Sequence, residues 1–97
     1  MEKSLEKVDG HYIVCGVGST GRHIVDELIK TGHKVVAIER NHRLLDELGN
    51  TPAVKLHGDA TEDEILLKAK PEDAAGLFAA LPSDKDNLVI TLTARQT

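Results

Sequence analysis

Three glycines and a later glutamate have the residue types and the spacing of a nucleotide-binding turn. Gly16, Gly18 and Gly21 follow the apolar run YIVC and open a segment with helical periodicity. Glycine loses more backbone freedom on folding than any other residue, so three of them at one turn indicate a need for bare backbone. A glycine-rich turn between a strand and a helix can present backbone N–H groups to a phosphate. The chemistry that this turn favours is the binding of a phosphorylated ligand.

Each glycine has an expected role. The first allows a tight turn, the second lets the backbone approach a pyrophosphate, and the third lets the following helix pack closely on the sheet. Free N–H groups from residue 17 to residue 20 and the positive end of the helix would attract the anion. Packing of the turn, with no ligand, is the alternative explanation. The ligand-binding residues expected in this turn are Gly16, Val17, Gly18, Ser19, Thr20 and Gly21.

An acidic residue ends the second β-branched run, KVVAIE, at Glu39. It stands at about the distance from the glycines at which a carboxylate accepts hydrogen bonds from an adenosine ribose. A carboxylate there repels a 2′-phosphate, so NAD(H) or an adenosine nucleotide is favoured over NADP. Arg40 next to it is expected either to hold a phosphate or to form an exposed salt bridge, and the sequence leaves both open.

The segment GDAT follows the third predicted strand and reaches the same edge of the sheet as the glycine turn. Asp59 could accept from an adenine amino group, while the backbone of Ala60 reads the edge of the ring. A simple helix-capping turn at Asp59 and Thr61 is the alternative. Leu81 and Pro82 end the fourth predicted strand and are expected to form a wall of the site.

Alternating strands and helices position these residues. The pattern predicts strands over 12–16, 34–39, 53–58 and 76–81, with helices over 20–30 and from Asn41 to Leu48. A capping box at Thr61–Glu64 is expected to start a third helix, and a cap at Ser83 or Asp84 a fourth. Short connections favour a Rossmann-like α/β fold: a parallel sheet in the order 3-2-1-4, with helices on both faces. The sheet is truncated relative to the full dinucleotide fold. Residues 1–10 form a lead-in and 11–97 the domain.

Composition excludes several functions. The chain has 97 residues, a formal net charge of −4 and 2% aromatic residues, which argues against a nucleic-acid or anionic-membrane partner. The five histidines match no metal-binding spacing, and Cys15 lies within an apolar strand, where an inert thiol is expected.

No nucleophile has an evident base partner, so an enzyme is not favoured. The absence of a signal peptide or long apolar segment indicates a reducing, cytoplasmic setting.

Taken together, four segments resemble the RCK N-terminal domain, the regulator of potassium conductance, also called the TrkA-N domain. They are HYIVCGVGSTGRHIVDEL, VVAIERN, LHGDAT and AALPSDKDNLVITLTAR, and the resemblance runs from about residue 11 to residue 95. It implies phosphates on the glycine turn, the ribose on Glu39 and the adenine on Asp59 and Ala60. Family ligands include NAD(H), AMP, ADP and ATP, among which the sequence does not choose.

The resemblance also implies partners. The module would assemble as a homodimer or larger ring, and nucleotide occupancy would change the opening of a potassium channel pore or the activity of a transporter membrane subunit. Its place would be the cytosolic side of the inner or plasma membrane. Family members continue through further strands, so this chain is expected to be a fragment that self-associates beside its fourth strand. Two alternatives stay open: the cofactor-binding half of an NAD-dependent dehydrogenase-like enzyme, and an assembly scaffold with a vestigial glycine turn.

Overall fold

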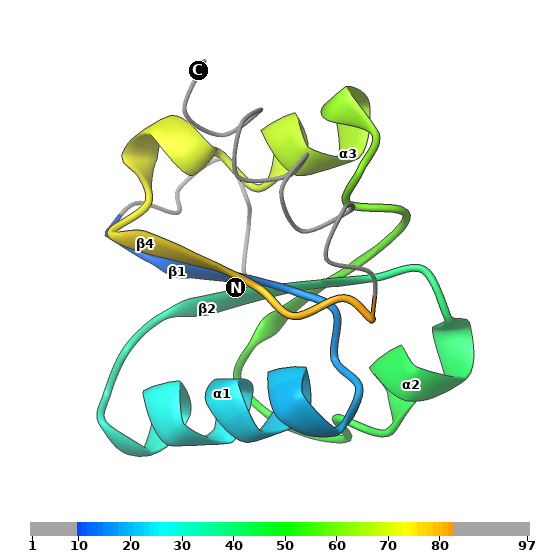
Figure 1. Cartoon of the computed structure of the whole chain (residues 1–97). Coiled ribbons are helices and arrows are strands. Elements are labelled where there is room, and N and C mark those ends of the chain that lie inside the picture. The colour runs from blue at the N-terminus through cyan, green and yellow to red at the C-terminus, as the bar shows by residue number, and fades with distance from the viewer. Residues whose placement is uncertain (1–9, 83–97) are drawn as a thin grey trace.

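The computed structural model describes residues 10–82, which form a parallel sheet with helices on both faces (Figure 1). α1 and α2 lie on one side of the sheet and α3 on the other. The strand order β3-β2-β1-β4 confirms the predicted Rossmann-like topology. The predicted fourth helix, after Ser83 or Asp84, lies outside the described residues. The elements are β1 (Tyr12–Cys15), α1 (Ser19–Lys30), β2 (Val35–Glu39), α2 (His42–Asp46), β3 (Val54–His57), α3 (Asp63–Lys68), the short 3₁₀ helix η2 (Pro71–Asp73) and β4 (Gly76–Ala79).

The sheet divides the core into two layers, because alternate side chains of a strand point to opposite faces. Ile13, Cys15 and Ile38 pack on the α3 side together with Leu66. Residues at the alternate positions of the strands, such as Val14, point to the other face and pack with residues of α1 and α2. β1 and β2 are buried on both faces, which explains why their sequences are continuous apolar runs.

The end of α1 and the start of α2 follow the predicted signals. Gly32 has φ +85° just after α1, and its N–H donates to the carbonyl of Ile29 at 3.0 Å, while the N–H of His33 donates to Leu28 at 3.0 Å. This pair of bonds is the Schellman arrangement that satisfies the last carbonyls of a helix. At the start of α2, the side chain of Asn41 accepts from the N–H of Arg43 at 3.0 Å, as a cap should.

Three sequence predictions about element ends are wrong. α2 ends at Asp46, two residues before the predicted Leu48. The capping box at Thr61–Glu64 does not form: α3 begins at Asp63, with Glu62 at the cap position and no side-chain cap. The hydroxyl of Thr61 instead donates to Asp59 at 2.6 Å. β4 ends at Ala79, two residues before the predicted Leu81. Its partner β1 ends at Cys15, so the chain beyond Ala80 has no β1 residue left to pair with.

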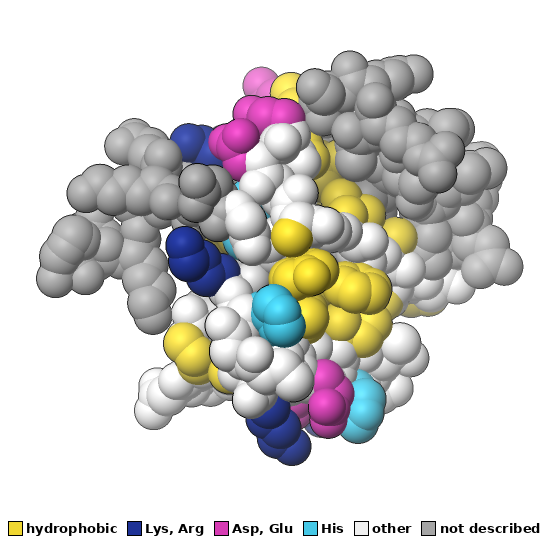
Figure 2. All heavy atoms as spheres, turned by 90° about the vertical axis from the view of Figure 1, so that its left-hand side faces the viewer, with side chains coloured by type: hydrophobic (Ala, Val, Ile, Leu, Met, Phe, Trp, Pro, Cys, Tyr) yellow, Lys and Arg dark blue, Asp and Glu magenta, His cyan; other side chains and the backbone are white. Residues whose placement is uncertain are grey.

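Hydrophobic side chains gather on the side of the molecule where β1 and β4 begin, which Figure 2 shows. Tyr12 of β1 lies with its ring centre 6.0 Å from that of Phe78 of β4 and 5.1 Å from that of His33. Phe78 keeps 38% of its surface exposed. This aromatic group lies at the opposite edge from the glycine turn, so it takes no part in the site described below. The predicted self-association beside the fourth strand stays a prediction.

Candidate functional site

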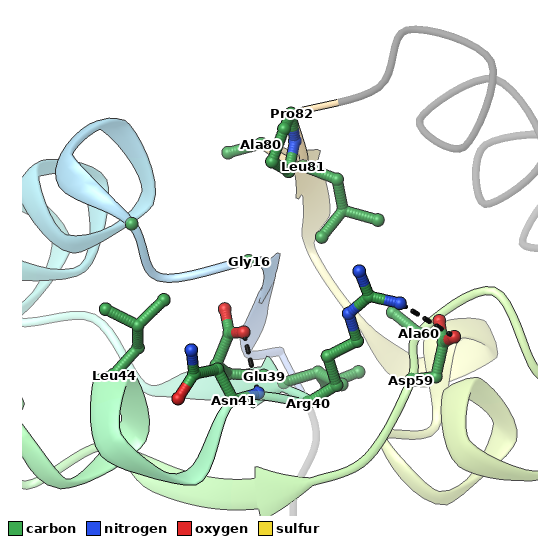
Figure 3. A pocket seen from close by; sticks show the side chains of 12 residues that line it. Gly16, Glu39, Arg40, Asn41, Leu44, Asp59, Ala60, Ala80, Leu81 and Pro82 are labelled. Atoms are coloured by element: carbon green, nitrogen blue, oxygen red, sulfur yellow. Dashed lines mark hydrogen bonds and ion pairs between the residues drawn. The ribbon is translucent and has the colours of Figure 1, made fainter.

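A pocket of about 250 Å³ opens at the carboxyl edge of the sheet, where the glycine turn, β2, β3 and β4 end side by side (Figure 3). Leu44 of α2 and Leu81 after β4 form apolar walls, and Arg40 reaches between Leu81 and Asp59. Ligands of open parallel sheets bind at this edge. The residues that line the pocket are Gly16, Gly18, Ile38, Glu39, Arg40, Asn41, Leu44, Asp59, Ala60, Ala80, Leu81 and Pro82.

Gly16 is required by the fold itself. It has φ +93°, and a Cβ at this position would lie 2.9 Å from both the carbonyl oxygen of Ala80 and Cδ2 of Leu81. A side chain would therefore strain the backbone and press on the segment that follows β4. The tight turn that the sequence predicts is thus confined by the segment that follows β4.

Gly21 is also required by packing, while Gly18 is not. A Cβ at Gly21 would overlap the carbonyl group of Gly16, because the first turn of α1 lies directly against the glycine turn. A Cβ at Gly18 would meet nothing within 4 Å, and Gly18 has an ordinary φ of −67°. Protein packing thus explains two of the three glycines. Gly18, the remaining glycine, leaves bare backbone open toward the pocket.

The partial positive charge at the N-terminal end of α1 is not neutralised by a side chain of the helix itself. Gly18 occupies the cap position, no side chain caps the helix, and its first turn contains no acidic residue. The first N–H groups of an α-helix have no partner within the helix, so this end can attract an anion. Together with the open space at Gly18, it forms a cradle suited to a phosphate group.

The expectation of a free N–H at Val17 is wrong. This N–H donates to Oε1 of Glu39 at 2.8 Å, and the Val17 side chain is buried in the core. The cause is tertiary: β1 and β2 are neighbours, so the carboxylate at the end of β2 reaches the glycine turn after β1. The anion cradle therefore begins at Gly18.

Glu39 lies at the base of the pocket with 7% of its surface exposed. Besides the bond from Val17, its Oε2 accepts from the N–H of Asn41 at 2.9 Å. An ionised carboxylate has about four acceptor positions, so two remain for a ligand. Glu39 joins the glycine turn to the start of α2 and also presents a negative, acceptor-only group to the pocket.

Asp59 forms a local turn on one side and faces Arg40 on the other. Its Oδ1 accepts from both the N–H and the hydroxyl of Thr61, at 2.9 and 2.6 Å, and its Oδ2 lies 3.9 Å from Nη1 of Arg40. The hydrogen bonds from Thr61, with a smaller contribution from Arg40, lower the pKa of Asp59 below its ordinary value of 3.8. Asp59 thus makes a local turn with Thr61 but not the predicted helix cap, because α3 begins at Asp63 with Glu62 at its cap position. The expected contact of Asp59 with adenine stays a prediction.

The substitution Thr61→Ala is expected to raise the pKa of Asp59, because the hydroxyl is the largest cause of its lowering. A lowered pKa stabilises the fold above the ordinary value of 3.8, and this stabilisation is lost as the pH falls through the lowered value. A carbon-detected NMR titration of the Asp59 carboxyl would measure the change. Arg40→Gln is the matched control and should produce a smaller rise, because this guanidinium is 77% exposed. An unchanged pKa in Thr61→Ala would contradict the assignment.

The structure brings most, but not all, of the predicted site residues together. Gly16, Gly18, Glu39, Arg40, Asp59, Ala60 and Leu81 line the pocket. Ser19 and Thr20 line a separate shallow hollow with His23 and Ile24. Val17, Gly21 and Thr61 line neither, and contribute through the bonds and packing described above. Four lining residues were not predicted from the sequence: Ile38, Asn41, Leu44 and Ala80. Asn41 had been recognised only as a helix cap, and Leu44 only as part of the helical repeat.

Cys15 takes no part in the site. It is fully buried, and burial raises the pKa of its thiol to about 12, so it stays protonated at neutral pH. Within residues 10–82, no group of three or more His, Cys, Asp and Glu side chains is arranged to hold a metal ion. Among the same residues, no helix is long and apolar enough to cross a membrane.

Comparison with known proteins places these features in a family. The model of the TrkA-N domain matches residues 12–97. This chain belongs to the TrkA-N domain family. Potassium channel protein 1 of Methanocaldococcus jannaschii is 41% identical over 98 residues, covering 99% of this chain and 29% of that protein. The Trk system potassium uptake protein TrkA of Mycobacterium tuberculosis is 37% identical over 82 residues, covering 84% of this chain and 37% of that protein.

Solved structures confirm the fold of this TrkA-N domain. The TrkA-N domain of the inner membrane protein ybaL from Escherichia coli has a TM-score of 0.84 and 26% identity, over 93% of this chain and 67% of that one. The GsuK channel, solved bound to NAD, has a TM-score of 0.81 and 24% identity, over 94% of this chain and 17% of that one. The chain thus spans under a third of the length of the potassium channel protein, and these relatives are potassium channel and uptake proteins.

Proposed function

We propose that this TrkA-N domain binds an adenine nucleotide or NAD(H) and so regulates a potassium channel or transporter. The observation that supports the binding most directly is at Gly18: packing requires no glycine there, yet Gly18 lies in the pocket at the uncapped start of α1. A glycine with open space at a phosphate-binding turn is explained by close approach of a ligand.

Separate groups of residues would hold the parts of a nucleotide. The backbone from Gly18 to Thr20 would hold phosphate oxygens, and the two unused acceptor positions of Glu39 would hold the ribose hydroxyls. Asp59 and the backbone of Ala60 would contact the adenine. GsuK has been solved bound to NAD and, in another structure, bound to ADP, which supports this ligand class for the shared fold.

The charges around the ribose position favour ligands without a 2′-phosphate. The Glu39 carboxylate would repel a second anion at this buried position. Arg40 compensates only in part, because its guanidinium is 77% exposed and also lies 3.9 Å from the Asp59 carboxylate. NAD(H), AMP, ADP and ATP are therefore expected to bind better than NADP(H).

The regulatory role rests on the relatives. The domain would act on the cytosolic side of the membrane, as a homodimer or larger ring joined to a channel pore or transporter subunit. Nucleotide binding would favour one arrangement of that ring over another, because a ligand shifts an equilibrium by its difference in affinity for the two states. In this proposal the chain's own residues would supply the nucleotide binding.

Calorimetric titration of the chain with NADH, NAD, NADPH, AMP, ADP and ATP tests the binding. Saturable binding of a ligand lacking the 2′-phosphate, about tenfold or more tighter than NADPH, is expected from the charge repulsion. In Glu39→Gln this preference should shrink, since the amide is neutral. Glu47→Gln, an exposed change outside the pocket, is the matched control and should keep the preference. Folded protein that binds none of these ligands would contradict the proposal.

A further inference from the structure

Two histidines that are far apart in the sequence meet beside the pocket. His42 is the first residue of α2, and His57 is the last residue of β3. Their ring centres are 5.1 Å apart, and the ring planes are nearly perpendicular at 83°. Both side chains are exposed. Pairing of β2 with β3 creates this proximity, since Glu39 and His57 are register partners at the end of the two strands.

Each ring has one nitrogen held by an oxygen acceptor. Nδ1 of His42 lies 3.2 Å from Oδ2 of Asp46, and Nε2 of His57 lies 3.0 Å from the carbonyl oxygen of Arg40. With these nitrogens donating, Nε2 of His42 and Nδ1 of His57 carry free lone pairs, and neither has a hydrogen-bond partner within residues 10–82. Histidines that bind metals are held in this way, with the second N–H donated to a carboxylate or a backbone carbonyl.

The separation of the rings suits a shared metal ion. A metal–nitrogen bond of about 2.1 Å places a ring centre about 3.3 Å from the metal. When the angle between the two bonds at the metal is about 100–110°, the ring centres are about 5.1–5.4 Å apart. The observed 5.1 Å lies within this range. Both side chains are exposed, so they can rotate to point their free nitrogens at one ion while the ring centres keep this separation.

We propose that His42 and His57 form an open site for a borderline divalent cation of the Zn²⁺ class. Imidazole nitrogens favour such ions over Mg²⁺ or Ca²⁺. Within the described residues no third histidine, cysteine or carboxylate completes a metal-binding group, so water fills the other positions. The Asp46 carboxylate supplies negative charge beside the site, and Arg40 is offset by Asp59 at 3.9 Å. This inference is independent of the proposed nucleotide function.

Titration of the chain with ZnCl₂ at pH 7.5, in a buffer that does not bind metals, tests the site. One ion is expected to bind, and His42→Ala and His57→Ala should each weaken it at least tenfold. Asp46→Asn should weaken it by about tenfold, because loss of an orienting carboxylate costs metal affinity of this order. His23→Ala removes an exposed histidine of α1 that lies outside this pair, and should leave the affinity unchanged.

All four substitutions are at exposed positions, so far-ultraviolet circular dichroism should show the same fold in each. A wild-type chain that binds no Zn²⁺ would overturn the proposal. Unchanged affinity in both His42→Ala and His57→Ala would overturn it equally, because the ion would then be held elsewhere.

Discussion

The substitution Gly18→Asp is expected to weaken nucleotide binding by about a hundredfold or more while the domain stays folded. A carboxylate would enter the space next to the first N–H groups of α1, where the phosphate is proposed to bind. It would occupy part of the cradle and repel the phosphate at short range, and both effects oppose binding. The fold should tolerate the change, since a Cβ at this position meets nothing within 4 Å and φ is −67°. Aspartate is also a favourable residue at a helix cap.

Calorimetry with the tightest nucleotide, alongside thermal unfolding, would measure both parts of this prediction. Gly49→Asp is the matched control: it makes the same change of charge at another glycine with open space, outside the pocket. Gly49→Asp should change the affinity for the nucleotide by no more than about twofold. Some loss of stability is expected in this control, because Gly49 has a φ of +65°. Equal affinity in wild type and Gly18→Asp would place the phosphate elsewhere.

The second large effect is on stability. Gly21→Ala is expected to lower the free energy of unfolding by about 3 kcal/mol or more, because backbone rather than a flexible side chain stands in the way. A Cβ here would overlap the Gly16 carbonyl, whose carbon would be only 2.7 Å away. Helix propensity alone predicts the opposite sign, a gain of about 1 kcal/mol for alanine in the first turns of α1. The sign of the change therefore separates close packing from local propensity.

Urea unfolding monitored by circular dichroism would measure this loss. Gly18→Ala is the matched control, three residues earlier in the same turn, and should lower the stability by no more than about 1 kcal/mol, the loss expected when alanine replaces glycine at a helix cap. A stable Gly21→Ala variant would show that α1 can move away from the glycine turn. The explanation of Gly21 by packing would then fail, and its role would have to be assigned to the ligand instead.

Several features of this domain follow from local sequence patterns. The β-branched runs, the glycine turn, the cap at Asn41 and the stop at Gly32 each depend on residues close together in the chain, so their periodicity and residue types are sufficient. The alternation of strands and helices then restricts the topology, because crossovers between parallel strands are right-handed and short. For this reason the strand order and the edge of the sheet that carries the pocket were predictable.

Errors arose where a donor could bond to more than one acceptor, either nearby in the chain or across the sheet. Thr61 could have capped a helix, but Asp59 holds its hydroxyl, and α3 begins two residues later. The N–H of Val17 could have faced a phosphate, but it bonds to Glu39 across the sheet. A local sequence pattern shows which hydrogen-bond donors and acceptors a segment contains. It does not show which of them form hydrogen bonds with one another in the folded domain.

Sequence by itself determined the parallel sheet, the site at the ends of its strands and the residue types available for a nucleotide. Tertiary structure alone decided which glycines are needed for packing, since the contacts of Gly16 and Gly21 are made with the segment after β4 and with the glycine turn itself. It also decided that His42 and His57 are neighbours. The physical reason is the same in each case: strand pairing brings together residues that are separated in sequence, and close packing then determines which atoms are in contact.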